Sequence, residues 1–118
     1  MLLFSQNVFD ELVVGTAHYF TASTLEGLLA TADFLVVIAH VTEVAGGSPR
    51  LVVYLEQSCN GRDWYAPSTA LIDAAIANDT VVAGMSGNES LGFARLRVAL
   101  QGSSPQARIR IGGCGRSV

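Results

Sequence analysis

The sequence contains no lysine, and only 14% of its 118 residues are charged. That content is low for a soluble domain, and two explanations stay open: a surface partly covered by a partner, or a strand-rich body made largely of valine and alanine. All seven basic residues are arginine, whose planar guanidinium group is favoured in interface ion pairs. A GC-rich genome accounts for the same bias, so the missing lysine carries no functional conclusion by itself.

Cysteine and histidine are also scarce: the chain has only Cys59, Cys114, His18 and His40. Two cysteines are too few for a disulfide framework, and we expect both thiols to be unpaired, unless the turn at 59–63 lies beside the last strand. No spacing among the four residues is typical of a zinc site, so neither a metal nor another cofactor is expected. His40 stands among Val, Ile and Ala, which is typical of a satisfied core or interface histidine.

Motifs for catalysis and for membranes are missing as well. The carboxylates are scattered, and neither a nucleophile elbow nor a glycine-rich phosphate loop is present, so we expect no enzyme activity. The first residues lack the basic region of a signal peptide, and the longest apolar run, residues 34–41, is too short to span a membrane. We therefore expect a chain that is not exported by a cleaved signal and has no membrane partner.

What the sequence does contain is a series of short apolar runs separated by turn residues. Residues 33–44 (DFLVVIAHVTEV) are apolar on both faces, which predicts a central strand covered on both sides. After a turn at 45–49, residues 50–58 are expected to return antiparallel to it. The predicted fold is a single all-β domain over residues 1–118, an antiparallel β-sandwich of jelly-roll or Greek-key type.

The remaining segments are expected to be shorter or mixed. Residues 21–32 (TASTLEGLLATA) predict either a short helix or an edge strand, and both readings stay open. Before this segment, we expect one or two short strands in residues 1–20, with 11–15 as the better candidate. After the central strands, we expect one or two helical turns in 70–77, a strand at 80–84 and a loop at 85–92. The chain is expected to end with a hairpin of residues 93–100 and 106–112.

That last hairpin is expected to carry an arginine face. Arg95, Arg97, Arg108 and Arg110 alternate with aliphatic residues, so they share the face away from the core. If residues 101–106 close the hairpin, Arg97 faces Arg110 and Val98 faces Ile109, and like charges in that position are unfavourable. Acids of the chain, a neighbouring subunit, a bound polyanion or simply solvent and salt are the open ways to offset them.

Charge is distributed unevenly along the chain, which favours an acidic protein surface over nucleic acid as the partner of these arginines. Residues 1–49 hold five acids and no arginine, whereas residues 95–118 hold five arginines and no acid, so the two ends can attract each other within a chain or between copies. The net charge is −3, and no aromatic residues interleave with the arginines, which argues against nucleic acid.

A turn signal precedes the only tryptophan. Asn60 and Gly61 close an apolar strand, which is a strong hairpin signal, and Trp64 is expected to fold back as a plug in the core. The segment Ser58–Trp64 resembles the pattern S-x-D-G-x-x-W, with Asn60 in place of the usual Asp. Together with residues 50–66 and 93–112, about a third of the chain, it is similar to small β-sandwich virion proteins of tailed phages and phage-derived particles, found as head-decoration or tail components.

This resemblance implies a non-enzymatic structural protein located in a virion or phage-derived particle, or otherwise in the bacterial cytoplasm. Its partners would be itself, as a trimer or higher homo-oligomer, or a major capsid or tail protein. The same turn is similar to that of discoidin-like carbohydrate- or lipid-binding modules, which are typically longer, are exported and begin with a cysteine that is missing here. The alternative function is therefore a ligand-binding module whose loops 59–63, 85–92 and 102–106 share one end of the sandwich.

Overall fold

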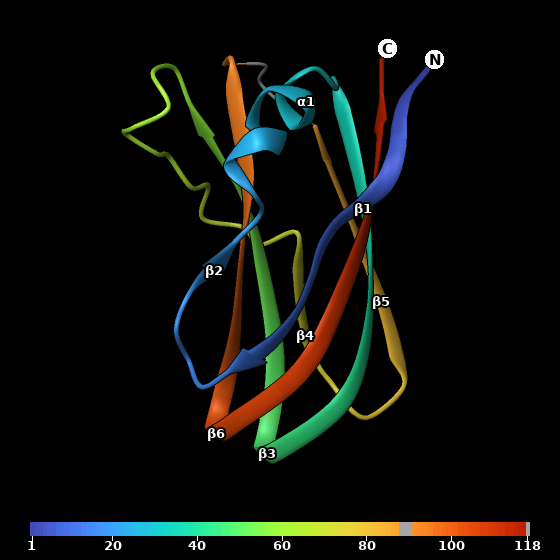
Figure 1. Cartoon of the computed structure of the whole chain (residues 1–118), viewed down its shortest axis with the longest axis vertical. Coiled ribbons are helices and arrows are strands. Elements are labelled where there is room, and N and C mark those ends of the chain that lie inside the picture. Colours follow the sequence, from blue (N-terminus) through green and yellow to red (C-terminus); the bar gives the residue numbers. More distant parts are fainter. Residues whose placement is uncertain (88–90, 118) are drawn as a thin grey trace.

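Two long strands, β3 (Phe34–Ser58) and β6 (Phe93–Arg116), run antiparallel to each other along their full length. The computed structural model describes residues 1–87 and 91–117 (Figure 1). The other elements are β1 (Leu2–Val14), β2 (Tyr19–Phe20), the 3-10 turn η1 (Ser23–Leu25), the helix α1 (Glu26–Ala30), β4 (Ile72–Ala75) and β5 (Thr80–Gly87). Pairing runs from Phe34 opposite Arg116 to Ser58 opposite Phe93.

Both long strands bend sharply at the same level, at residues 43–49 of β3 and 101–106 of β6 (Figure 1). The register shifts at this level, and Gly46 and Gly102 have φ angles of +106° and +130°, which favour glycine. A Cβ atom on Gly46 would lie 2.6 Å from the carbonyl oxygen of Ser104, and one on Gly102 would lie 2.7 Å from that of Gly47. Glycine therefore allows the two backbones to stay in contact while the ribbon folds over.

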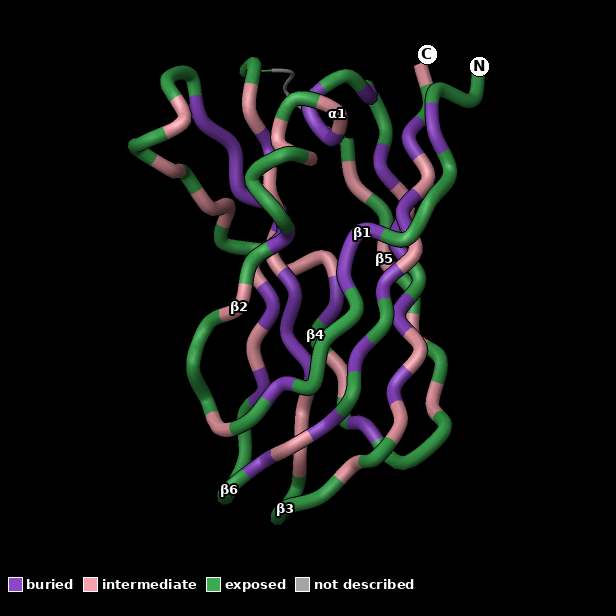
Figure 2. Tube along the Cα trace, viewed as in Figure 1, coloured by how far each residue is buried: buried purple, intermediate pink, exposed green. Residues whose placement is uncertain are grey.

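The bend divides the sheet into two halves that face each other across one core. In one half the order is β1, residues 108–116 of β6, residues 34–42 of β3, then β5; in the other it is β2, residues 93–101 of β6, residues 50–58 of β3, then β4. Buried residues alternate with less buried ones along residues 34–42 of β3 and along β6, whereas residues 51–58 of β3 are buried on both faces except at Tyr54 (Figure 2). The core side chains of these strands are Leu35, Val37, Ala39, Val41, Leu51, Val53, Leu55, Ala94, Leu96, Val98, Leu100, Ala107, Ile109 and Ile111.

The predicted all-β, antiparallel class with one short helix is confirmed. Of the two readings left open for residues 21–32, the helix is the correct one: η1 and α1 cover one end of the core, where Leu29 and Ala30 are buried. Glu26 lies in the first turn of α1, and no side chain caps the start of either helical segment.

Both predicted hairpins around the bends are wrong. Residues 34–42 and 50–58 belong to one strand and do not pair with each other, and the same holds for residues 93–101 and 106–116. Arg97 therefore lies opposite Tyr54 rather than Arg110, and Val98 lies opposite Val53 rather than Ile109. The glycine, serine and proline residues at 45–49 and 102–105 form matching bends in two neighbouring strands, because each bend is hydrogen-bonded to the other.

Three shorter predictions also need correction. Residues 1–20 contain two strands, within the expected number, but the first, β1, is long rather than short, because residues 2–14 pair with the end of β6 apart from two bulges. Residues 72–75 form a strand instead of a helical turn, since pairing with residues 50–53 of β3 overrides their local preference. The strand expected at 80–84 is present and extends to Gly87, so residues 85–87 are not loop, and 88–90 lie outside the described residues.

Candidate functional site

The four arginines predicted to share one face lie on the two different halves of the sheet. Arg95 and Arg97 are on the outer side of one half, whereas Arg108 and Arg110 are on the outer side of the other. The bend in β6 at residues 101–106 separates the two pairs. The predicted single arginine face therefore does not exist, and each pair has its own surroundings.

Arg95 and Arg97 both form ion pairs with Glu56 of the same chain. Arg95 Nε lies 2.8 Å from Glu56 Oε1, and Arg97 Nη1 lies 3.0 Å from Glu56 Oε2, so one carboxylate serves both cations. The Glu56 side chain is only 6% exposed, and the arginine side chains are 21% and 25% exposed. Of the alternatives left open by the sequence, an acid of the same chain is the one that lies next to the positive charges of Arg95 and Arg97.

Aromatic rings complete the cover of this half. The Arg95 guanidinium lies between the rings of Phe20 and Trp64, 4.0 and 4.1 Å from their centroids, and the Arg97 guanidinium lies 4.7 Å from that of Tyr54. Such cation–π contacts are favourable and are stronger where water is excluded. The prediction that Trp64 is a core plug is wrong: the ring covers Arg95 on the outside of the sheet and is partly exposed.

The turn before Trp64 is held by Asn60, as the sequence pattern predicts for a structural turn residue. Asn60 Oδ1 accepts hydrogen bonds from the backbone N–H groups of Arg62 (2.8 Å) and Asp63 (2.9 Å), while Asn60 Nδ2 donates to Asp63 Oδ2 (2.9 Å). Gly61 has a φ of +74°, which the turn requires. The chain then returns through a single bridge from Tyr65 to Gln57, so the hairpin is minimal. An Asp at position 60 would meet the Asp63 carboxylate, which explains the Asn in this chain.

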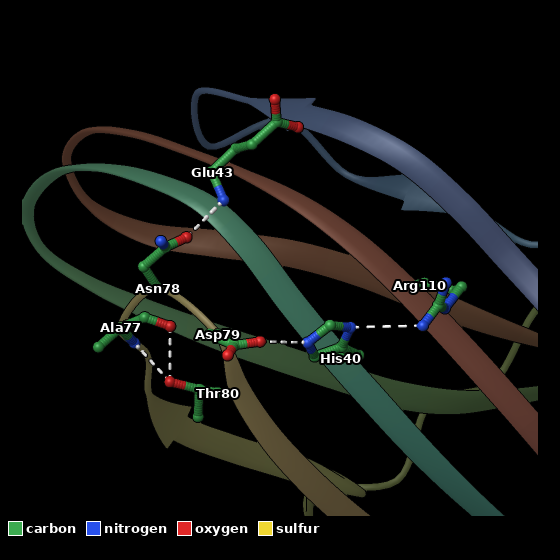
Figure 3. Close-up of polar contacts among 7 residues, drawn as sticks. All are labelled: His40, Glu43, Ala77, Asn78, Asp79, Thr80 and Arg110. Carbon is green, nitrogen blue, oxygen red and sulfur yellow. Dashed lines mark hydrogen bonds and ion pairs between the residues drawn. The ribbon is translucent and has the colours of Figure 1, made fainter.

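Arg108 and Arg110 belong to a polar cluster on the outer side of the other half. Arg108 Nη2 lies 3.1 Å from Asp10 Oδ1. This ion pair links the arginine-rich C-terminal segment to the acidic N-terminal segment, as the charge pattern indicates. Arg110 Nη2 lies 3.4 Å from His40 Nδ1, and His40 Nε2 lies 2.8 Å from Asp79 Oδ1 (Figure 3). His40 is therefore satisfied as predicted, but it lies at the surface and not in the core.

The turn that carries Asp79 is held by one hydrogen bond to β3 and by another within the turn. Asn78 Oδ1 accepts from the Glu43 backbone N–H at 2.7 Å, and Thr80 Oγ1 donates to the Ala77 carbonyl at 2.6 Å (Figure 3). Asp79 itself has a φ of +62°, in the left-handed region. These contacts fix the position of the Asp79 carboxylate next to His40, so the cluster is built into the fold.

Beyond this polar cluster, the same outer side is apolar and exposed. Phe34 and Ile38 of β3 are 40% and 49% exposed, and Val81 and Met85 of β5 are 63% and 65% exposed. Register places Ile38 opposite Ala83 and Val36 opposite Met85, so these side chains form one patch. We call Phe34, Val36, Ile38, Val81, Ala83 and Met85 the outer apolar face. The prediction that this strand is covered on both sides is wrong for the single chain.

A shallow groove borders the outer apolar face. It is lined by Ser5, Gln6, Asn7, Val36, Ile38, Gly112, Gly113 and Cys114. The groove exists because β6 has glycine at 112 between the side chains of β1 and β3. Cys114 Sγ lies 3.4 Å from Ser5 Oγ, and both Cys114 and Cys59 are free thiols, as predicted.

A second cavity, of about 350 Å³, opens at the end of the molecule opposite the bends. It is lined by Leu55, Gln57, Tyr65, Pro67, Ser86, Gly87 and Leu91. The predicted grouping of loops at one end is only partly correct, because residues 102–106 lie at the opposite end from residues 59–63. The cavity and the buried Glu56 were both missed by sequence reasoning. The sequence feature that could have indicated them is the pair of polar residues, Glu56 and Gln57, at the end of an apolar strand.

The described parts of the chain, residues 1–87 and 91–117, contain no cluster of three or more side chains suited to hold a metal ion. Among them there is also no helix of the length and hydropathy needed to cross a membrane. Comparisons with protein family models, with curated proteins and with solved structures find no match for the chain.

Proposed function

We propose that this chain is a non-enzymatic structural protein that associates with copies of itself through the outer apolar face, as a component of a phage-like particle. The observation that carries the proposal is the exposure of Phe34, Ile38, Val81 and Met85 on one outer side of the sheet. A contiguous exposed apolar patch next to polar groups is typical of a protein–protein interaction site.

A second copy is the occupant that the surface favours. The polar cluster beside the patch carries both signs of charge, with Asp10 and Asp79 as acids and Arg108 and Arg110 as bases. In a two-fold arrangement the same surface meets itself, so acids of one copy can face arginines of the other. The groove above Gly112 offers room for a side chain of the second copy.

Strand order gives further support. Counting each half of β3 and β6 separately, the pairings follow the order of an eight-stranded jelly roll, and we infer that architecture for the chain. Jelly rolls are frequent in viral capsid proteins but also in lectins, so the fold alone does not fix the function. The resemblance of Ser58–Trp64 and of residues 93–112 to phage virion proteins favours the capsid or tail setting, with a shell protein as a further partner.

The test is the oligomeric state of the chain and of one variant, measured by light scattering from low to high micromolar protein. The unaltered chain should form a dimer, or a larger assembly built from such dimers, and Ile38→Arg should dissociate the dimer because a cation would be buried against apolar side chains. Val14→Arg is the matched control, since Val14 is 51% exposed and lies outside the outer apolar face. A chain that stays monomeric at the highest concentration, or an Ile38→Arg variant that assembles normally, would reject the proposal.

A further inference from the structure

The cavity at the end opposite the bends contains an unmet hydrogen-bonding group. Gln57 is 92% buried, and within residues 1–87 and 91–117 its Oε1 is the one buried side-chain oxygen or nitrogen without a hydrogen-bond partner. A buried acceptor without a donor is unfavourable, and native proteins rarely keep one without a reason. Because Gln57 lines the cavity, a molecule that enters the cavity from solvent can supply the missing hydrogen-bond donor.

The wall of the cavity defines what kind of partner fits. Among the described residues that line it, none is an acid, an arginine or a histidine, so a charged ligand would find no counter-ion among these side chains. Tyr65 and Pro67 supply flat apolar surfaces, and Ser86 Oγ donates to the Gly87 carbonyl and keeps its lone pairs available as acceptors. The volume of about 350 Å³ lies at the lower end of the range for small-molecule sites.

We propose that this cavity binds a small neutral molecule with several hydroxyl groups and an apolar face, of the size of a monosaccharide. A hydroxyl group both donates and accepts, so it satisfies the Gln57 amide whichever way the amide is turned. The ring of Tyr65 provides a surface for the C–H groups of the sugar.

The site is held in place before a ligand arrives. The Gln57 backbone N–H donates to the Tyr65 carbonyl at 2.9 Å, and the Tyr65 N–H donates to the Gln57 carbonyl at 2.8 Å. The amide and the ring therefore belong to one bridged pair at the end of β3, next to the structured turn at Asn60. Such preorganisation reduces the entropy cost of binding.

The experiment is a titration of the ¹⁵N-labelled chain with glucose, galactose and N-acetylglucosamine, followed by NMR at the backbone amides of Tyr65, Ser86 and Leu91. We expect saturable shifts at these amides with at least one of the sugars. Gln57→Met, which keeps the length of the side chain and removes the amide, should weaken that binding at least tenfold. Gln101→Met, the same change at an exposed position beside the bend, is the matched control and should leave binding unchanged.

A second readout separates this role from a purely structural one. Because Gln57→Met removes an unmet buried acceptor, it should raise the melting temperature by a few degrees, on the order of 4 °C per kcal/mol for a chain of this size. A lower melting temperature would mean that the fold itself uses the amide, and would overturn the proposal. So would the absence of shifts with all three sugars, or binding that survives in Gln57→Met.

Discussion

Glu56→Gln is the substitution that tests the buried ion-pair cluster most directly. Glu56 is the shared partner of Arg95 and Arg97, and its carboxylate is almost inaccessible to water. Replacing the carboxylate by an amide keeps the shape of the side chain but removes its charge. Two guanidinium groups on the same side of β6 are then left next to each other without an anion.

The expected cost follows from how far these groups can recover their hydration. Removing one member of a fully buried ion pair costs about 3–5 kcal/mol, because the remaining charge is uncompensated. Arg95 and Arg97 are 21% and 25% exposed, so they regain some contact with water, which lowers the expected loss to about 2–3 kcal/mol. With an unfolding entropy of about 2.1 cal/mol/K per residue, this corresponds to a fall in melting temperature of about 8–12 °C.

Thermal and urea unfolding of the purified variant measure this loss. The matched control is Asp10→Asn, which removes the acid from an ion pair whose side chains are 48% and 47% exposed, and should cost less than about 0.5 kcal/mol. The loss in Glu56→Gln should also change little with salt, since the pair is shielded from solvent. Equal stability losses in the two variants would refute the argument that Glu56 holds this half of the sheet together.

Substitutions at two further positions, Gly102 and Asn60, test the bend and the turn. Gly102→Ala should cost at least about 2 kcal/mol in urea unfolding, because it combines a φ of +130° with a Cβ 2.7 Å from the Gly47 carbonyl oxygen. The control Gly27→Ala, at a helical position with open space around it, should be neutral or slightly stabilising, and similar losses in both would contradict the role of the bend. Asn60→Ala should cost about 1–2 kcal/mol through lost turn hydrogen bonds, while Asn60→Asp should fall between Ala and the unaltered chain because its carboxylate meets Asp63. Equal melting temperatures for all three chains would show that the turn does not depend on this side chain.

Period-two patterning predicted the class of the fold and the direction of many side chains. Leu96, Val98 and Leu100 alternate with polar or small residues, and the structure buries all three as expected. The prediction works because each strand has one face toward the shared core, which the sequence records as alternation. Element type and inward residues are local properties, so they can be read without knowing the partner strand.

Strand pairing could not be read in the same way. The segments around residues 45–49 and 102–105 contain the Gly, Ser and Pro that are typical of hairpin loops, and a local reading predicts two hairpins. Whether such a segment closes a hairpin or bends a longer strand depends on what lies beside it. Here the partner of each bend is the other bend, more than fifty residues away in the chain. The wrong pairing of Arg97 with Arg110 followed directly from that local reading.

The candidate sites show the same division between local and long-range information. The turn at Asn60 was predicted because its hydrogen bonds join residues within three positions of one another. The position of Trp64 was predicted incorrectly, since a cation–π contact with Arg95 on a distant strand decides it. The cavity at Gln57 brings together β3, β5 and the segment after the turn, and no single stretch of sequence contains that information.

The two outer sides of the molecule provide the main argument for assembly, because one chain treats them differently. On the side of β2 and β4, the chain covers its own sheet with Phe20, Trp64 and the arginines that flank Glu56. On the side of β1 and β5, Ile38 and Met85 are left exposed, although the strand β3 is equally apolar there. Covering a face of the sheet orders side chains and buries charge, and both cost free energy. The chain bears this cost on the side of β2 and β4 but leaves the side of β1 and β5 uncovered. If a second copy supplies the missing cover, the exposed fractions of Ile38 and Met85 should fall on assembly while that of Trp64 stays constant, which oxidation footprinting of Met85 and Trp64 can measure.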